Sequence, residues 1–328
     1  MADILLETVD LVKSFPIRSG VFGQQKVRLM AVDEVSLVIH KGETLGLVGE
    51  SGCGKSTLGL TIMKLYEPTS GAILFEGHDI AKLEGVELRK HRRLMQMIFQ
   101  DPLASLDPRM VVEEVIREPL DIQQQGTSQE RNEIVQRLLQ VTGMPVDAAA
   151  RLPSEFSGGQ QQRIGIARAL ALQPKLLVCD EPVSALDVSV QAQILNLLRD
   201  LQGQFDLAYL FISHNIAVTA FMSQRIGVMY LGRLVEIGPS RDIVNAPLHP
   251  YTMALINAVP DAEPEARGRK RSLTGDVPSP IDRPKGCPFH PRCPWVQDRC
   301  KAERPLLRQI APDQFAACHF AEPGKKMS

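Results

Sequence analysis

Short apolar stretches alternate with longer stretches of helical spacing from about Leu5 to Leu255. Three of the apolar stretches, Thr44–Gly49, Leu176–Cys179 and Leu207–Ser213, contain almost no polar residue. Continuous apolar strands are typical of a parallel sheet that is covered on both faces. Because helical patterns lie between these strands, the sequence predicts an α/β domain.

Two of the helical stretches have readable ends. Thr127 and Glu130 have the spacing of a capping box, and Gly143 is a candidate C-cap for the helix that follows. Apolar residues recur in that helix at Ile134, Val135, Leu138 and Leu139. A second helix is predicted over 188–202, ending at Gly203, with one apolar face made of Val190, Ile194, Leu197, Leu198 and Leu201.

The pattern changes after Pro260. Eight of the 23 prolines lie between Pro260 and Pro294, together with the basic run Arg267–Arg271. Proline removes a backbone donor, so we expect an exposed connection and a small appendage that regular secondary structure does little to support. The basic run is either a solvated linker or a contact for membrane phosphates.

Composition and charge exclude several classes of protein. Hydrophobic residues make up 44% and charged residues 23%, the balance of a globular chain. The net charge of −1 argues against a nucleic-acid binder that works through a global basic field. No apolar run reaches the roughly 18–20 residues that cross a bilayer, and the acidic N-terminus lacks the layout of a signal peptide. We therefore expect a cytosolic protein.

The six cysteines fall into two groups. Cys53 and Cys179 are isolated, and we expect buried thiols there. The other four are close together in the last fifth of the chain, at Cys287, Cys293, Cys300 and Cys318. In a cytosolic protein such a group favours a metal site over disulfides. The gaps are longer than those of zinc fingers, and four thiolates suit either zinc or an iron–sulfur cluster.

The strongest local signal is the segment Gly49-Glu50-Ser51-Gly52-Cys53-Gly54-Lys55-Ser56-Thr57. It matches G-x-x-x-x-G-K-[ST] between a predicted strand and a predicted helix, which is the context that this pattern requires. The glycines let backbone N–H groups turn inward around phosphate oxygens. Lys55 supplies positive charge, and the Ser56 hydroxyl is placed for Mg²⁺.

Two acidic residues end the strand at Leu176–Cys179. Asp180 is a candidate for the Mg²⁺ shell, and Glu181 for polarising an attacking water. A second glycine-rich helix start, Phe156-Ser157-Gly158-Gly159-Gln160, provides another anion-binding end. Two anion-binding ends in one chain make sense if the second end contacts a nucleotide that is held by another subunit.

On these motifs the chain resembles, over essentially its whole length, the ATP-binding subunit of an ABC transporter. In that family Gly49–Ser56 corresponds to Walker A, Asp180 and Glu181 to the end of Walker B, and Ser157–Gln160 to the signature. The resemblance assigns further roles to four residues: the Q-loop Gln100, which with Ser56 and Asp180 would reach Mg²⁺; the D-loop Asp187; the switch His214; and the adenine-stacking Phe15. Phe15 could instead be plain core, and Asn215 stands where the family usually has Asp.

Longer segments resemble the dipeptide/oligopeptide permease ATPases, and specifically their F-type subunit. They are Pro102–Arg109, Asp180–Ser189 and His249–Thr252, with Ser14–Gly20 near the N-terminus. The resemblance implies a P-loop NTPase domain over 1–258, a helical subdomain at about 100–170, and a C-terminal extension over 259–328. It also favours a 4Fe–4S cluster on the four clustered cysteines, with zinc and unliganded thiols as the alternatives. Its cargo would be di- or oligopeptides, or alternatively nickel or glutathione.

The implied assembly is a complex at the cytoplasmic face of the membrane. It would join this chain to a second homologous ATPase subunit, two transmembrane permeases and an extracytoplasmic solute-binding protein, with ATP enclosed between the Walker motifs of one subunit and the signature of the other. In ABC-type ATPases of DNA repair a long coiled coil separates the Walker motifs, but heptads are absent between Ser56 and Leu176. Tandem-cassette ATPases have two P-loops, whereas this sequence has one. Glu181 and His214 argue against a regulatory module without turnover.

Overall fold

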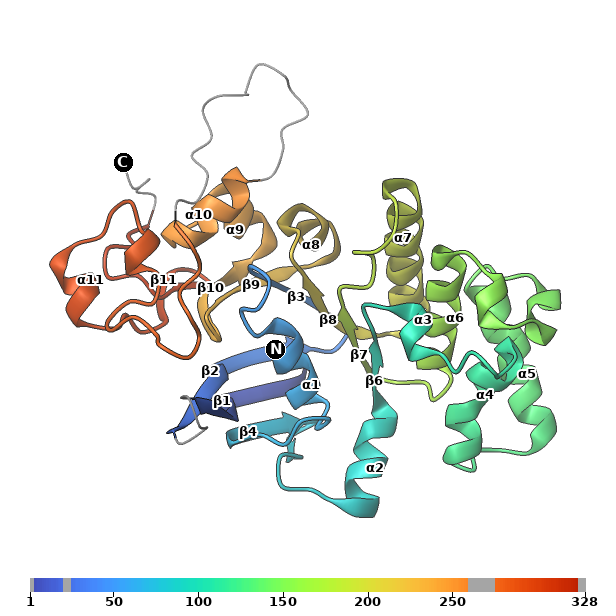
Figure 1. Cartoon of the computed structure of the whole chain (residues 1–328). Helices are drawn as coiled ribbons and strands as arrows, with labels where there is room; N and C mark the ends of the chain where they lie inside the picture. Colours follow the sequence, from blue (N-terminus) through green and yellow to red (C-terminus); the bar gives the residue numbers. More distant parts are fainter. Residues whose placement is uncertain (1–2, 20–24, 259–274, 324–328) are drawn as a thin grey trace. The chain divides into compact units, whose positions relative to one another are not determined.

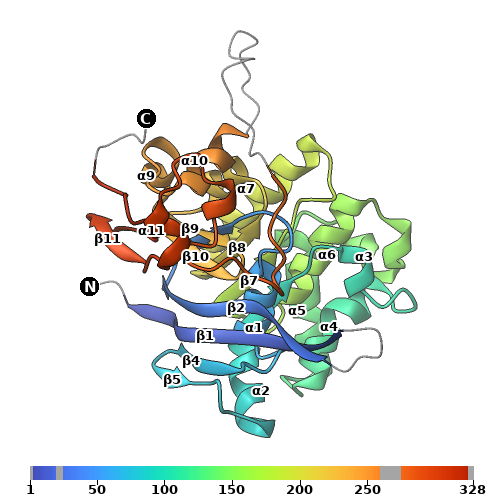
Figure 2. The ribbon, with the colours of Figure 1, turned by 60° about the vertical axis from the view of Figure 1, so that its left-hand side comes forward.

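The computed structural model describes residues 3–19, 25–258 and 275–323 (Figures 1 and 2). The chain divides into two compact units. Unit 1 comprises Met1–Leu6, Ile39–Glu43 and Phe75–Ile212, and unit 2 comprises Glu7–Val38, Thr44–Leu74 and Ser213–Ser328. Each unit combines strands and helices, so the α/β class is confirmed. The basic run Arg267–Arg271 lies outside the described residues, and the domain boundary expected at 258/259 falls at their edge.

A parallel sheet forms the centre of unit 1. Its strands are β6 (Met95–Ile98), β7 (Leu176–Asp180) and β8 (Ala208–Ser213), in the order β8-β7-β6. Every residue of β7 and β8 is buried, as the continuous apolar pattern predicts. Because the strands are parallel, their carboxyl ends meet at one edge, where Asp180 is in register with Ile212. The unit also contains the two-residue strand β5 (His78–Asp79) and the helix α2 (Gly85–Leu94).

A run of helices occupies the part of unit 1 where a helical subdomain is expected. It consists of α3 (Pro102–Ser105), α4 (Val112–Ile122), α5 (Ser128–Val141), the 3-10 turns η1 (Val146–Ala150) and η2 (Pro153–Glu155), and α6 (Gly158–Leu170). Helix α5 begins with the predicted capping box, in which the Thr127 hydroxyl accepts from the amide of Glu130 and the Glu130 carboxylate accepts from the amide of Thr127. Gly143 follows its last turn with φ +70°, the left-handed conformation expected of a helix end.

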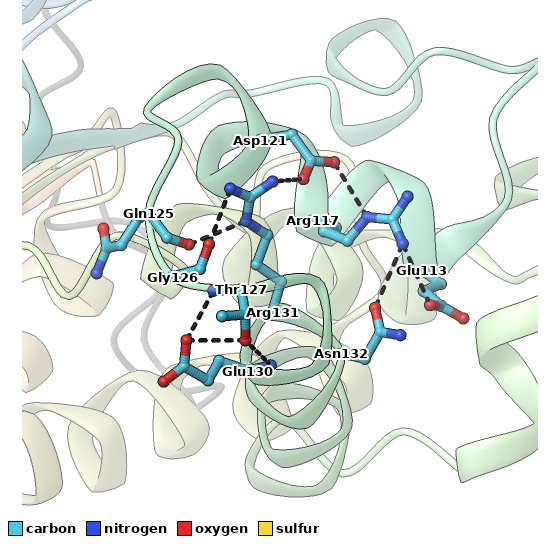
Figure 3. A network of polar contacts seen from close by, with 9 residues as sticks. All are labelled: Glu113, Arg117, Asp121, Gln125, Gly126, Thr127, Glu130, Arg131 and Asn132. Atoms are coloured by element: carbon cyan, nitrogen blue, oxygen red, sulfur yellow. Dashed lines mark hydrogen bonds and ion pairs between the residues drawn. The ribbon is translucent and has the colours of Figure 1, made fainter.

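Two arginines join α4 to α5 (Figure 3). Arg117 Nε donates to Asp121 Oδ2 at 3.0 Å, and Arg131 Nη1 pairs with Asp121 Oδ1 at 2.5 Å. Arg131 also donates to two carbonyl oxygens of the connection between the helices, those of Gln125 (2.9 Å) and Gly126 (3.0 Å). The two helices and their connection are therefore held by one polar network centred on Asp121.

Helix α7 departs in part from the prediction. It spans Val188–Phe205 and continues through Gly203, and Asp206 ends it in the left-handed conformation. Its fully buried residues are Ile194, Leu195, Leu198 and Leu201, whereas Val190 and Leu197 are half-buried. The expected stop was wrong because a single glycine inside a helix costs only about 1 kcal/mol, which burial of the apolar face outweighs.

Unit 2 contains most of a sheet ordered β2-β1-β4, with β1 (Ile4–Ser19), β2 (Gln25–His40) and β4 (Ser70–Phe75). Five further strands of this unit are neighbours in the order β3-β9-β10-β12-β11, where β3 (Thr44–Val48) and β9 (Arg225–Tyr230) are parallel. The helices are α1 (Lys55–Ile62), α8 (Ile216–Met222), α9 (Ser240–Asn245) and α10 (Pro250–Asn257). Among the helices of the described residues, none has the length and apolar character needed to cross a bilayer.

The C-terminal segment has more regular structure than its prolines suggest. After the 3-10 turn η4 (His290–Arg292) and the short helix α11 (Asp298–Ala302), the chain forms β11 (Arg308–Ala311) and β12 (Gln314–Ala316). Strand β12 pairs antiparallel with β10 (Arg233–Pro239) and so extends the sheet of unit 2. The expectation of little regular support was therefore wrong, because the strands follow the proline-rich stretch, where the backbone donors are available again.

The Asp121 network predicts a pH-dependent stability. Burial alone would raise the pKa of Asp121, but hydrogen bonds from Arg131 and Arg117 outweigh it and lower that pKa. Such a carboxylate stabilises the fold fully above its unfolded pKa of about 4 and loses this effect as the pH falls through the folded pKa. Because the side chain is 41% exposed, Asp121→Asn should lower the free energy of unfolding by about 1 kcal/mol or less at pH 7, and by less at pH 4.

Urea unfolding followed by circular dichroism at the two pH values measures this difference. Asp200→Asn, at an exposed aspartate of α7, is the control and should change stability little. An Asp121→Asn loss of the same size at both pH values would contradict the role given to the network.

Candidate functional site

The predicted phosphate-binding loop of unit 2 has the local structure that its sequence indicates. Strand β3 ends at Val48, a loop follows over residues 49–54, and α1 begins at Lys55. An added Cβ at Gly49 would lie 2.3 Å from the carbonyl oxygen of Met229, and one at Gly54 would lie 2.0 Å from that of Ala31. These two glycines are therefore required by close backbone approach, and Gly54 also has φ +104°.

The loop encloses the side chain of Lys55, which is 4% exposed. Its ammonium donates to the carbonyl oxygen of Gly49 at 2.7 Å and to that of Glu50 at 3.1 Å. The lysine is thus held against its own loop, where it can exchange these carbonyl contacts for phosphate oxygens. Ser56 and Thr57 are half-buried in the first turn of α1, while Ser51 and Gly52 lie exposed in the loop.

The two isolated cysteines are buried thiols, as predicted. Cys53, within the phosphate-binding loop, is 4% exposed, and burial raises its pKa. Cys179, in β7, is fully buried, and burial raises its pKa as well. Both side chains are therefore protonated at neutral pH and serve as small apolar groups rather than nucleophiles.

His214 directly follows β8 and is exposed. The next residue, Asn215, caps α8: its Oδ1 accepts from the amides of Ala217 at 3.0 Å and Val218 at 3.2 Å. Asparagine and aspartate cap helices about equally well, which explains why this chain tolerates Asn where the resembling family usually has Asp. The capped helix fixes the backbone immediately after His214.

The acidic strand end of unit 1 brings two predicted residues together. Asp180 ends β7 and is 7% exposed, whereas Glu181 has φ +47°. The left-handed conformation is strained for glutamate, and such strain is concentrated at functional positions. Gln100, which follows β6 and is exposed, has its Nε2 3.5 Å from Glu181 Oε2. The parallel strands thus place side chains 81 residues apart within reach of one another.

The signature segment forms the start of α6. Ser157 is its N-cap, and both its amide (3.0 Å) and its hydroxyl (3.2 Å) donate to Gln160 Oε1. Gly158 is exposed, whereas Gly159 is buried so close to α7 that an added Cβ would lie 2.4 Å from Val190 Cγ1. Asp187, the predicted D-loop residue, is exposed as the N-cap of α7.

Phe15 lies half-buried on β1. Its ring meets that of Tyr66 edge to face at 5.3 Å, and the Lys13 ammonium lies 4.8 Å from its centroid. A ring with these contacts can stack on an adenine base. The same contacts also suit a partly buried residue of the protein core.

The four clustered cysteines line one cavity in unit 2. Burial raises the pKa of Cys287 to about 12 and that of Cys293 to about 11, and it also raises the pKa of Cys318. Among the described residues, no three His, Cys, Asp or Glu side chains lie close enough together to hold one metal ion. The four thiols thus line one cavity without forming such a group, and the iron–sulfur cluster and the zinc alternative both stay predictions.

Two residues next to the phosphate-binding loop were not anticipated. The Tyr251 hydroxyl accepts from the amide of Glu50 at 2.8 Å, and Arg292 pairs with the Glu50 carboxylate. The sequence gives only an indirect indication of these contacts. A tyrosine in an apolar setting needs a hydrogen-bond partner for its hydroxyl, and an arginine among apolar residues needs an acidic partner. Neither signal identifies that partner.

Comparison with known proteins gives consistent matches. The family model of the ABC transporter matches residues 32–184, and that of the oligopeptide/dipeptide transporter C-terminal region matches residues 235–300. The oligopeptide transport ATP-binding protein AppF of Bacillus subtilis is 51% identical over 97% of this chain and 98% of its own length. The protein named "Probable peptide ABC transporter ATP-binding protein y4tS", of Sinorhizobium fredii, is 50% identical over 98% and 92%.

A solved structure is also similar to this chain. It is the dimeric post-hydrolysis state of the ATP-binding cassette MJ0796 bound to ADP and Pi, with a TM-score of 0.64 and 29% identity. The match covers 72% of this chain and 99% of that one. The fold of the chain is therefore that of a nucleotide-binding cassette with additional residues.

The two left-handed glycines of the phosphate-binding loop predict different effects of one added methyl group. Gly54→Ala should lower stability by about 3 kcal/mol or more, because strain at φ +104° adds to the clash with Ala31. Gly52→Ala should cost only about 1–2 kcal/mol, since φ is +78° but an added Cβ has no neighbour within 4 Å. Thermal unfolding of both variants without nucleotide measures the contrast, and equal losses would contradict the packing described for Gly54.

Proposed function

The chain belongs to the ABC transporter ATP-binding subunits that carry the oligopeptide/dipeptide transporter C-terminal region, and we propose that it hydrolyses ATP to drive import of di- or oligopeptides. The observation that carries this proposal is the 51% identity to an oligopeptide transport ATP-binding protein along nearly the full length of both chains. The names of the relatives favour peptides over nickel, glutathione or a non-transport role. The phosphate-binding loop around Lys55 provides the nucleotide chemistry.

We propose that the loop of unit 2 binds the phosphates. Lys55 would turn from the carbonyls of Gly49 and Glu50 to the outer phosphates, and amides of residues 51–57 would donate to phosphate oxygens. Phe15 would stack on the adenine ring. Mg²⁺, held by Ser56, Asp180 and Gln100, would neutralise charge on the phosphates.

Glu181 is the proposed catalytic base. Its strained backbone and the nearby Gln100 amide fix the direction of its carboxylate, so that it can accept a proton from an attacking water. His214, held after β8 by the capped helix α8, would contact the γ-phosphate. This division of roles requires no covalent intermediate, because positioning and charge stabilisation supply the catalysis of phosphoryl transfer.

The exposed signature segment suits a nucleotide held by another subunit. Ser157, Gly158 and Gln160 are exposed at the N-terminal end of α6, where helix amides and the helix dipole attract anions. We propose that a second homologous ATPase subunit presents its nucleotide to this segment, with Asp187 at the same interface. ATP would then hold the two subunits together, and hydrolysis would release them.

The proposed complex also contains two transmembrane permeases and an extracytoplasmic solute-binding protein. The ATPase subunit would be peripheral, at the cytoplasmic face of the membrane. The segment from Gln100 to Met110, which follows β6 and contains α3, would transmit the closing movement to the permeases.

We also propose that the four thiols of the C-terminal segment hold a 4Fe–4S cluster. Four thiolates can hold either zinc or an iron–sulfur cluster, and the resemblance to peptide-importer ATPases favours the cluster. A four-iron cluster binds each thiolate at a separate iron, which suits thiols spaced around one cavity. When bound, the cluster would supply bonds that stabilise a segment with little apolar core of its own.

Glu181→Gln tests the catalytic assignment in the assembled transporter. Removal of a general base should reduce the ATP hydrolysis rate about 10²- to 10⁴-fold while MgATP still binds. Glu87→Gln, at an exposed glutamate of α2, is the control and should hydrolyse ATP normally. Wild-type turnover by the Glu181→Gln transporter would show that another group is the base.

Anaerobic purification tests the cluster. The chain should be brown and contain about four irons, and replacing Cys287, Cys293, Cys300 and Cys318 by Ser should remove both the colour and the iron. Replacing the isolated Cys53 and Cys179 should leave them in place. A colourless, iron-free preparation with one zinc per chain would establish the zinc alternative, and one without any metal would leave structural thiols.

A further inference from the structure

Glu50, the second residue of the phosphate-binding loop, is held at both ends by residues far along the chain. Its amide donates to the Tyr251 hydroxyl at 2.8 Å. Its carboxylate receives two bonds from Arg292, Nη1 to Oε2 at 2.7 Å and Nη2 to Oε1 at 2.9 Å. Such a two-pronged pair fixes direction as well as distance, because the planar guanidinium matches the carboxylate plane.

This ion pair lies largely away from solvent. The Arg292 side chain is 4% exposed, and that of Glu50 is 25% exposed. Loss of either partner would leave the other charge partly buried without compensation, which is strongly unfavourable. The pair therefore constrains the loop far more than an exposed surface contact would.

An aromatic cluster anchors the turn that carries Arg292. Tyr251, Tyr230 and Phe289 form a cluster, with ring centroids 4.7 Å apart for the two tyrosines, 5.4 Å for Tyr230 and Phe289, and 5.5 Å for Tyr251 and Phe289. Phe289 is 1% exposed, and its carbonyl accepts from the Arg292 amide at 3.0 Å. The turn that carries Arg292 is thus anchored in the same packed cluster as Tyr251.

Two of the clustered cysteines border this turn. The carbonyl of Cys287 accepts from the amide of His290 at 3.0 Å, and Cys293 is the C-cap of η4. Cys287 also donates its amide to the carbonyl of Cys300 at 2.8 Å. A rearrangement of the thiols would therefore move the backbone that aims Arg292.

Glu50 in turn helps to determine where the Lys55 ammonium lies, since its carbonyl is one of the oxygens that accept from that group. We propose that Arg292 is a positioning residue for the phosphate-binding loop, and that through it the four-thiol site and nucleotide affinity are coupled. Arg292 touches Glu50 rather than the reacting atoms and acts through it. The inference rests on the proposed nucleotide site and adds a control element to it.

The test is MgATP binding to the full chain, measured by calorimetry. Arg292→Ala should raise the dissociation constant at least tenfold. Arg292→Lys should have an intermediate effect, because lysine keeps the charge but lacks the planar guanidinium that pairs with both carboxylate oxygens. Arg304→Ala is the matched control, since Arg304 lies in the same C-terminal segment and donates to the exposed carboxylate of Glu34 at 2.9 Å. It should change the constant less than twofold.

A double-mutant cycle distinguishes positioning from general destabilisation and remains usable if Arg292→Ala does not fold. Once Glu50→Gln has removed the carboxylate, adding Arg292→Lys should change MgATP affinity by less than twofold. Wild-type affinity in both single Arg292 variants, an equal loss in Arg304→Ala, or full additivity in the cycle would overturn the proposal. A wild-type chain that does not bind MgATP would instead overturn the proposed function.

The coupling to the thiols has its own measurement. Cys293→Ser should weaken MgATP binding in the wild-type background and have little effect once Glu50→Gln has removed the contact to the turn. Equal losses in both backgrounds, or no loss in either, would refute the coupling between the thiol site and the loop.

Discussion

The buried ammonium of Lys55 depends on a loop whose backbone can approach it from several directions. The carbonyls of Gly49 and Glu50 lie within hydrogen-bond distance of this group because the loop turns back on itself before α1 begins. At Gly49 and Gly54 the neighbouring carbonyl oxygens leave no space for a Cβ, so the turn is possible only with glycine. The proposed nucleotide chemistry requires this arrangement, since a misplaced cation could not meet the phosphates.

Unit 1 fixes its chemical groups by a different means. Parallel strands end at one edge, so Asp180 and the side chains that follow the neighbouring strands gather there without any special loop. The left-handed backbone of Glu181 turns its side chain toward Gln100, and the surrounding buried strands hold this strained conformation. A rigid sheet edge and a glycine loop are thus two solutions to the same problem of holding charge in a defined direction.

Features that depend on neighbouring residues were accessible from the sequence. The capping box of Thr127 and Glu130, the buried strands β3, β7 and β8, and the loop before Lys55 are determined by residues a few positions apart. The pair of Arg292 and Glu50 spans 242 residues, and its partners are chosen by packing that no local pattern encodes. Tertiary packing also explains the extra helical residues of α7 and the pairing of β12 with β10. In both places burial outweighs the local preference of a glycine or of prolines.

Strand β12 gives the C-terminal segment a place in the fold that a detachable module would not have. It covers the edge of β10, and Gln314, at its first position, donates to the buried carboxylate of Glu236 at 3.0 Å. Removing the segment would leave β10 as an open edge, with unpaired amides and carbonyls ready to recruit strands from other molecules. A shortened cassette of this type would therefore be prone to self-association, and fusions or tags at this end must preserve β12.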